Sequence, residues 1–199
     1  MSDFTLYLRL GFEHIADLQG YDHILFIVAL CAVYMLQDWR ELVWLVTAFT
    51  VGHSVTLALA TLDLVRIPSD VVEFLIPVTI VATALVNIVA KPNASPQLAR
   101  SSRIKRTKYG LALGFGLIHG LGFSNFLRSL LGAEESLFVP LLAFNIGLEL
   151  GQLAIVGGFL LTAWLLVRKA GMIHREWTLV LSGAAGGIAL LMLLERWPW

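Results

Sequence analysis

Long apolar runs separated by short polar stretches constrain the fold of this chain most strongly. A hydrocarbon core about 30 Å thick requires about 20 apolar residues per helix. Residues 42–62, 71–90, 109–127 and 177–194 come close to this length, and a fifth run, near 138–167, exceeds it. The composition agrees, because 58% of the residues are hydrophobic and only 14% are charged, against about 25% charged in a typical soluble domain. We therefore expect an all-α integral membrane protein.

One further apolar run is too short to cross a bilayer alone. Residues 24–36 reach a membrane-spanning length only if the helix begins near residue 20, which draws Asp22 and His23 into its first membrane turn. We therefore expect six transmembrane helices, the first over about 20–37. Residues 3–18 have apolar side chains at helical spacing and predict a short interfacial helix. The alternation of Phe4, Leu6 and Leu8 also fits an extended start.

Lysine and arginine predict the orientation, because they concentrate in cytoplasmic loops. Residues 91–108 carry six of them, and no acid occurs between Glu73 and Glu134. The loop 91–108 is therefore expected inside and both termini outside, with residues 1–199 forming a single membrane domain in a bacterial-type inner membrane. The N-terminus lacks the pattern of a cleaved signal peptide, so none is expected.

Ionisable side chains recur at one depth of the predicted spans, toward the outside. Imidazoles and carboxylates are costly in hydrocarbon, and such residues are functional candidates by default. A single intramembrane histidine or asparagine also fits a hydrogen bond between helices, and Glu73 also fits a helix cap. The convergence of several such groups favours a shared site. The candidate ligands are His14, Asp22, His23, His53, His119 and Glu149, with Glu73, Asn145 and Ser54 as supporting residues.

The donor types indicate a divalent transition metal. Imidazole and carboxylate together suit Ni²⁺, Co²⁺, Zn²⁺ or Fe²⁺. Cys31 is the one cysteine in the chain, so neither a thiolate cluster nor an intramolecular disulfide is expected.

Five sequence blocks carry a resemblance to a known family. In order along the chain they are GFEHIADLQGYDHILF, TAFTVGHSVTLALA, VEFLIPVTIVATALVN, GFGLIHGLGF and FNIGLELGQL. They resemble the HupE/UreJ family of membrane proteins, described as nickel and cobalt permeases associated with hydrogenase and urease operons. The resemblance implies that His14, Asp22 and His23 bind or admit the metal. Seven residues separate His14 from Asp22, more than in the family's usual pattern.

Two functions follow as expectations. The first is a permease that moves a nickel- or cobalt-class ion through an outward-facing histidine and carboxylate site. The second is an intramembrane zinc hydrolase acting on a lipid or peptide, with Glu149 or Asp22 as general base and Ser54 or Asn145 stabilising an oxyanion. The resemblance favours the permease. The expected partners are the metal ion and the lipid bilayer, with no nucleic acid, and association into an oligomer is compatible with the sequence.

Overall fold

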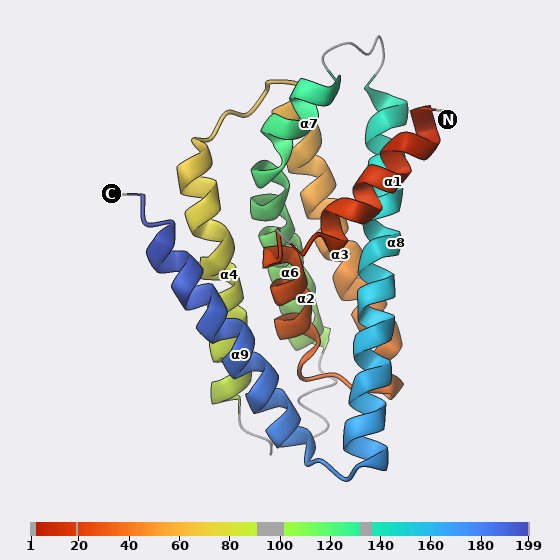
Figure 1. Cartoon of the computed structure of the whole chain (residues 1–199), viewed down its shortest axis with the longest axis vertical. Coiled ribbons are helices and arrows are strands. Elements are labelled where there is room, and N and C mark those ends of the chain that lie inside the picture. Colours follow the sequence, from red (N-terminus) through yellow and green to blue (C-terminus); the bar gives the residue numbers. More distant parts are fainter. Residues whose placement is uncertain (1–2, 19, 91–101, 132–136, 199) are drawn as a thin grey trace.

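The structure, a computed structural model, describes residues 3–18, 20–90, 102–131 and 137–198. These residues form helices and connecting turns, with no strand among them, which confirms the all-α prediction. Figure 1 shows an elongated bundle in which most helices run along the long axis. The helices are α1 (Asp3–Ala16), α2 (Asp22–Cys31), η1 (Leu36–Asp38), α3 (Trp39–Thr61), α4 (Ser69–Val89), α6 (Ser102–Gly122), α7 (Ser124–Leu131), α8 (Phe138–Ala163), η2 (Trp164–Lys169) and α9 (His174–Glu195).

Four helical segments are long and apolar enough to cross a membrane. They are Leu36–Thr61, Ser69–Val89, Phe138–Lys169 and His174–Glu195. They match the spans predicted at 42–62, 71–90, 138–167 and 177–194, and they make the chain an integral membrane protein by length and composition. The other two predicted spans take a different form.

The prediction of one continuous helix over 20–37 is wrong. Helix α2 has ten residues and ends at Cys31, so it is about 15 Å long and covers half of a hydrocarbon core. In Figure 1, α1 descends through the upper half of the bundle and α2 continues through the lower half. The first passage through the molecule is therefore broken near its middle, between Ala16 and Asp22.

Side chains from neighbouring helices satisfy the backbone where α2 ends. Asn87 Nδ2 donates to the Ala29 carbonyl at 2.7 Å, and Thr178 Oγ1 donates to the Ala32 carbonyl at 2.9 Å. The last carbonyls of a helix lack partners within the helix, and in hydrocarbon each unpaired one is costly. These two polar residues of α4 and α9 therefore explain why the helix can end inside the bundle.

The helix over Asp3–Ala16 excludes the extended alternative for the N-terminus. This helix does not lie as a separate interfacial element, because it packs lengthwise against the first half of α8. A Cβ at Gly11 would collide with the Phe144 carbonyl oxygen, and one at Gly147 would collide with the Leu8 carbonyl oxygen. Glycine at both positions lets the two backbones touch.

Helix α6 begins inside the predicted basic loop. Residues 102–108 are helical, and 91–101 lie outside the described residues. The predicted span 109–127 is also displaced, because α6 ends at Gly122 and the separate helix α7 follows. Helix α6 is not among the four apolar segments, since the positions up to Lys108 are rich in lysine and arginine. It packs along α3, where a Cβ at Gly116 would meet the Phe49 carbonyl oxygen.

The described ends of the chain lie toward the same end of the bundle. The start of α1 and the end of α9 are in the upper part of Figure 1, whereas the basic residues Lys108, Arg168 and Arg175 belong to segments at the lower end. We call the lower end the basic end. The described chain ends and the basic segments therefore lie at opposite ends of the bundle, as the predicted topology requires.

Candidate metal centre

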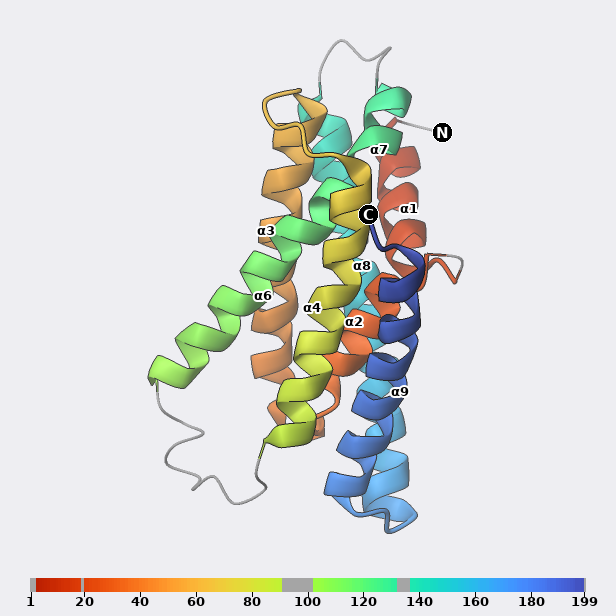
Figure 2. The same ribbon diagram turned by 90° about the vertical axis from the view of Figure 1, so that its left-hand side faces the viewer.

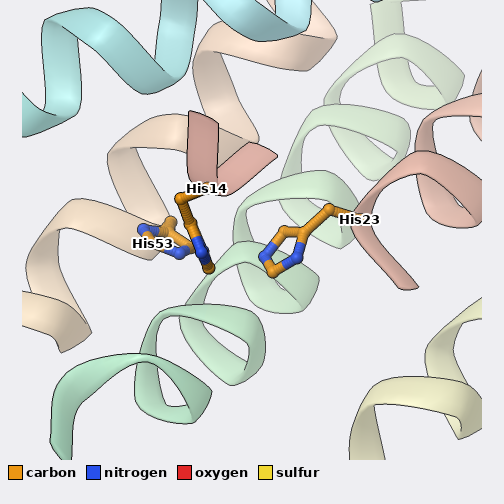
Figure 3. Close-up of side chains that lie close together, drawn as sticks. All are labelled: His14, His23 and His53. Carbon is orange, nitrogen blue, oxygen red and sulfur yellow. The ribbon is translucent and has the colours of Figure 1, made fainter. Parts of the chain in front are cut away.

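Three histidines from three helices converge near the break between α1 and α2. His14 lies near the end of α1, His23 near the start of α2 and His53 in α3. Each offers one ring nitrogen such that the three atoms lie within 4.8 Å of one another. Figure 3 shows the three rings turned toward a common space. We call these residues the histidine triad.

Each histidine of the triad has a buried ring nitrogen that lacks a hydrogen-bond partner among the described residues. His53 is fully buried and both of its ring nitrogens are unpaired, as are Nε2 of His14 and Nε2 of His23. A buried polar atom without a partner costs about 1–3 kcal/mol and requires an explanation. The donor set fits a borderline transition metal, because neutral imidazole nitrogen is the ligand such ions accept.

The carboxylate of Asp22 orients His23. Asp22 Oδ1 lies 2.9 Å from His23 Nδ1 and accepts the backbone N–H of His23 at 2.8 Å. A hydrogen bond from Nδ1–H to a carboxylate fixes the tautomer and leaves the Nε2 lone pair for a metal. Arg196 Nη1 lies 3.5 Å from Asp22 Oδ2. Asp22 is therefore a positioning residue that also carries negative charge beside the triad.

A fourth histidine, His119 of α6, stands beside the triad with its ring centre 5.1 Å from that of His23. His119 Nε2 lies 3.0 Å from Thr79 Oγ1, which lies 2.7 Å from the Ile76 carbonyl oxygen. Because the hydroxyl has one proton and the carbonyl can only accept, Thr79 donates to Ile76 and accepts from His119 Nε2–H. The lone pair is then on Nδ1, which is buried and unpaired.

Aromatic rings surround the triad. The Phe123 ring centre lies 3.8 Å from that of His14, and Phe123 stacks on Phe144. The Phe49 ring centre lies 5.1 Å from that of His119, and the Phe26 ring stacks on that of Phe49. This apolar wall lowers the local dielectric constant, which strengthens electrostatic interactions inside it.

A cavity of about 350 Å³ reaches the cluster from the side of the chain termini. It is lined by His14, His23 and His119, and by the carboxylates of Asp17, Asp22 and Glu73. Asp17 and Glu73 are exposed, so the cavity opens to the surroundings. Acidic groups at an opening raise the local concentration of cations. The supporting role predicted for Glu73 is consistent with this position.

The structure does not bring every predicted residue to the triad. Glu149 accepts hydrogen bonds from Thr47 and Thr50 of α3 instead. Asn145 donates to Leu141 in its own helix, and Ser54 donates to the Thr50 carbonyl. The shared depth of these residues was visible in the sequence, but the direction of each side chain depends on helix rotation.

Two residues of the site were missed from the sequence. Thr79 was one polar residue within an apolar run, and Arg196 was a cation beyond the end of the last span. Both types are common without a functional role. The one available signal was their predicted depth, which matches that of His119 and Asp22 respectively.

The fold and this cluster define an α-helical membrane protein with a buried, histidine-rich candidate metal site. A sequence model of the HupE / UreJ protein family matches residues 1–197, and the chain belongs to that family. The family is associated with nickel and cobalt transport or insertion. Searches of curated proteins and of solved structures found no match.

Proposed function

We propose that this protein moves a divalent transition-metal ion, of the nickel or cobalt class, across the membrane, with the histidine triad as its transient binding site. The observation that carries the proposal is that three histidines from three helices each offer one ring nitrogen within 4.8 Å of the other two. Each of the three also has a buried ring nitrogen without a hydrogen-bond partner in the part of the chain that the structure describes. In this proposal the metal is the substrate, and the cavity is its route from the outside.

The charge distribution supports a cation as substrate. Asp17 and Glu73 at the cavity opening attract it, and Asp22 beside His23 offsets its charge. Neutral imidazoles then replace part of its hydration shell. Binding should weaken as the pH falls, because protons compete with the metal for histidine lone pairs.

The break between α1 and α2 supports movement rather than permanent retention. His14 lies near the end of α1 and His23 near the start of α2, so a small rotation of either short helix would separate two ligands. Irregular backbone at membrane depth occurs where it lines a cavity, as in transporters with discontinuous helices.

The test is uptake of Ni²⁺, Co²⁺ or Zn²⁺ into sealed vesicles containing the purified protein. We expect uptake of at least one ion, and a loss of at least about tenfold in His53→Ala, the scale seen when metal-site contacts are removed. His174→Ala is the control, because His174 is exposed at the basic end. No uptake of any of the three ions by the wild-type protein, in either orientation, would contradict the proposal.

A second candidate is a zinc hydrolase, favoured by one observation. The triad supplies three histidines, of which His14 and His23 line the cavity. A catalytic zinc site has three protein ligands and water in the fourth position. Such a protein would retain its zinc through chelation and would transport none of the three ions. The same vesicles, treated with a chelator and analysed for bound zinc, separate the two functions.

A further inference from the structure

A second polar cluster lies on the far side of the triad from the cavity. Helix α3 ascends from the basic end in Figure 1 and Figure 2. Thr50 and Thr47 precede His53 by three and six residues, so they lie about 4.5 and 9 Å nearer the basic end along the helix. Glu149 and Gln152 of α8 join them there. We call these four residues the glutamate cluster.

The hydrogen bonds of this cluster are short and involve oxygen atoms. Thr47 Oγ1 donates to Glu149 Oε1 at 2.7 Å, and Thr50 Oγ1 makes a shorter contact with Glu149 Oε2. Thr50 Oγ1 also lies 2.7 Å from Gln152 Oε1. Thr50 Oγ1 also lies 3.2 Å from the Val46 carbonyl oxygen of its own helix. The single proton of the Thr50 hydroxyl cannot serve the Glu149 and Gln152 oxygens together, so one more donor is needed.

Two arrangements supply that donor, and they differ in the charge of Glu149. In the ionised form, Thr50 donates to Glu149 and the Gln152 amide turns so that its N–H donates to Thr50. In the protonated form, the Glu149 O–H donates to Thr50, and Thr50 donates to the Gln152 carbonyl oxygen. The same four side chains therefore satisfy their hydrogen bonds in both charge states.

No cation stabilises the ionised form within the described part of the chain. Glu149 has no ion pair there, and its hydrogen-bond partners are neutral hydroxyls. An unpaired charge at membrane depth is costly, and such residues commonly belong to proton or ion pathways. Glu149 is the twelfth residue of a 32-residue apolar segment, Phe138–Lys169, so it is far from either end.

The titratable groups on the elements packed against α8 do not pair with Glu149. None of those with described side chains forms a hydrogen bond or ion pair with it; on α1 they are Tyr7, Arg9, Glu13 and His14, on α2 Asp22, His23 and Cys31, on η1 Asp38, on α3 Arg40, Glu41 and His53, and on η2 Arg168 and Lys169.

We propose that Glu149 is an exchangeable proton site on the path between the histidine triad and the basic end. Its carboxylate takes up one proton from water and becomes a neutral acid that donates to Thr50. When a divalent ion moves past the triad, the acid releases that proton to the water at the basic end, and the carboxylate so formed compensates one of the ion's two charges. This step rests on the proposed transport function, but the proton site itself does not.

Infrared spectroscopy of the purified protein tests the proton site without transport. The carbonyl stretch of a protonated carboxyl group is distinct from the bands of a carboxylate. We expect such a band in the wild-type protein at neutral pH, and its loss in Glu149→Gln. Glu176→Gln is the matched control, since Glu176 is exposed at the start of α9, and the band should remain in it.

A second variant keeps the test decisive if Glu149→Gln fails to fold. Thr50→Val removes the hydroxyl that donates to the carboxylate and accepts from the acid, while nearly keeping the shape, so the carbonyl band of protonated Glu149 should shift in frequency. A wild-type band that Glu149→Gln leaves intact, or the absence of any band at neutral pH, would overturn the proposal.

Proton movement then tests the coupling. Vesicles containing a pH-sensitive dye should report proton release when metal is added. Glu149→Gln should bind metal with an affinity within about threefold of wild type. Its metal-driven proton signal should be at least about tenfold smaller. Wild-type protein that transports no metal contradicts the proposed function alone. Transport with an unchanged proton signal in Glu149→Gln contradicts the coupling.

Discussion

At the scale of single residues, the site is defined by which polar atoms have partners. Asp22 Oδ1 lies 2.9 Å from Nδ1 of His23, and Thr79 accepts from Nε2 of His119, so each ring keeps its other nitrogen for a ligand. Among the described residues, His53 has neither nitrogen paired. Asp22 is expected as a ligand from the sequence, and in the structure its carboxylate contacts the His23 ring.

Arg196 gives a prediction at this scale, because its charge competes with a bound metal. Its guanidinium lies 3.5 Å from Asp22 and lines the cavity. Arg196→Gln should tighten metal binding by about 1.4- to fivefold, corresponding to the ~0.2–1 kcal/mol of a partly exposed ion pair. Calorimetric titration with Ni²⁺ or Zn²⁺ measures the change.

Two matched variants complete this comparison. Arg196→Lys keeps the charge and should bind as the wild type does. Arg66→Gln removes an exposed arginine that pairs with Asp63 outside the cavity, and it should have no effect. Equal affinities in Arg196→Gln and wild type would show that the guanidinium does not compete with the ion.

At the scale of helices, two close backbone contacts hold the triad in place. Helices α3 and α6 touch at Gly116 and Gly120, which fixes His53 relative to His119. Helices α1 and α8 touch at Gly11 and Gly147, which fixes His14. The site therefore depends on glycines that are not themselves ligands.

A pair of glycine substitutions on α6 tests this dependence. Gly116→Ala places a Cβ against the Phe49 carbonyl oxygen, which is backbone and cannot move aside. We expect a loss of about 1–3 kcal/mol in the free energy of unfolding, typical of overpacking, together with weaker metal binding. Gly114→Ala is the control, because no atom lies within 4 Å of its Cβ, and alanine favours helix there. Equal losses in both variants would show that the contact is unimportant.

The sequence predicted the helices better than their breaks. Four apolar runs coincide with helical segments that are long and apolar enough to cross a membrane, because twenty apolar residues in a row have few alternatives. The end of α2 could not be predicted, since it depends on Asn87 and Thr178, which lie far along the chain. His14, His23 and His53 were identified by depth, whereas Glu149 was assigned to the same site because depth does not determine which helix a side chain faces.

At the scale of the whole molecule, the orientation in the membrane follows from the basic end. Positive loops favour the cytoplasm, so the cavity and both termini should face outward. Native Cys31 is buried, which leaves a low background for labelling introduced cysteines. Leu64→Cys and Ala170→Cys, exposed near opposite ends, report the two sides.

We expect an impermeant thiol reagent to label position 64 in intact cells and position 170 only after the membrane is permeabilised. Labelling of position 170 alone in intact cells would reverse the orientation, and the cavity would then face the cytoplasm.

If the histidine triad binds the metal, X-ray absorption at the metal edge should detect its imidazole rings in the ligand shell. Protein loaded with Zn²⁺ or Ni²⁺ should show a shell of imidazole nitrogens, at about 2.0–2.1 Å for zinc. His53→Ala should remove one imidazole from that shell, and His174→Ala should leave the spectrum unchanged. A shell of oxygen atoms alone, identical in wild type and His53→Ala, would contradict the account.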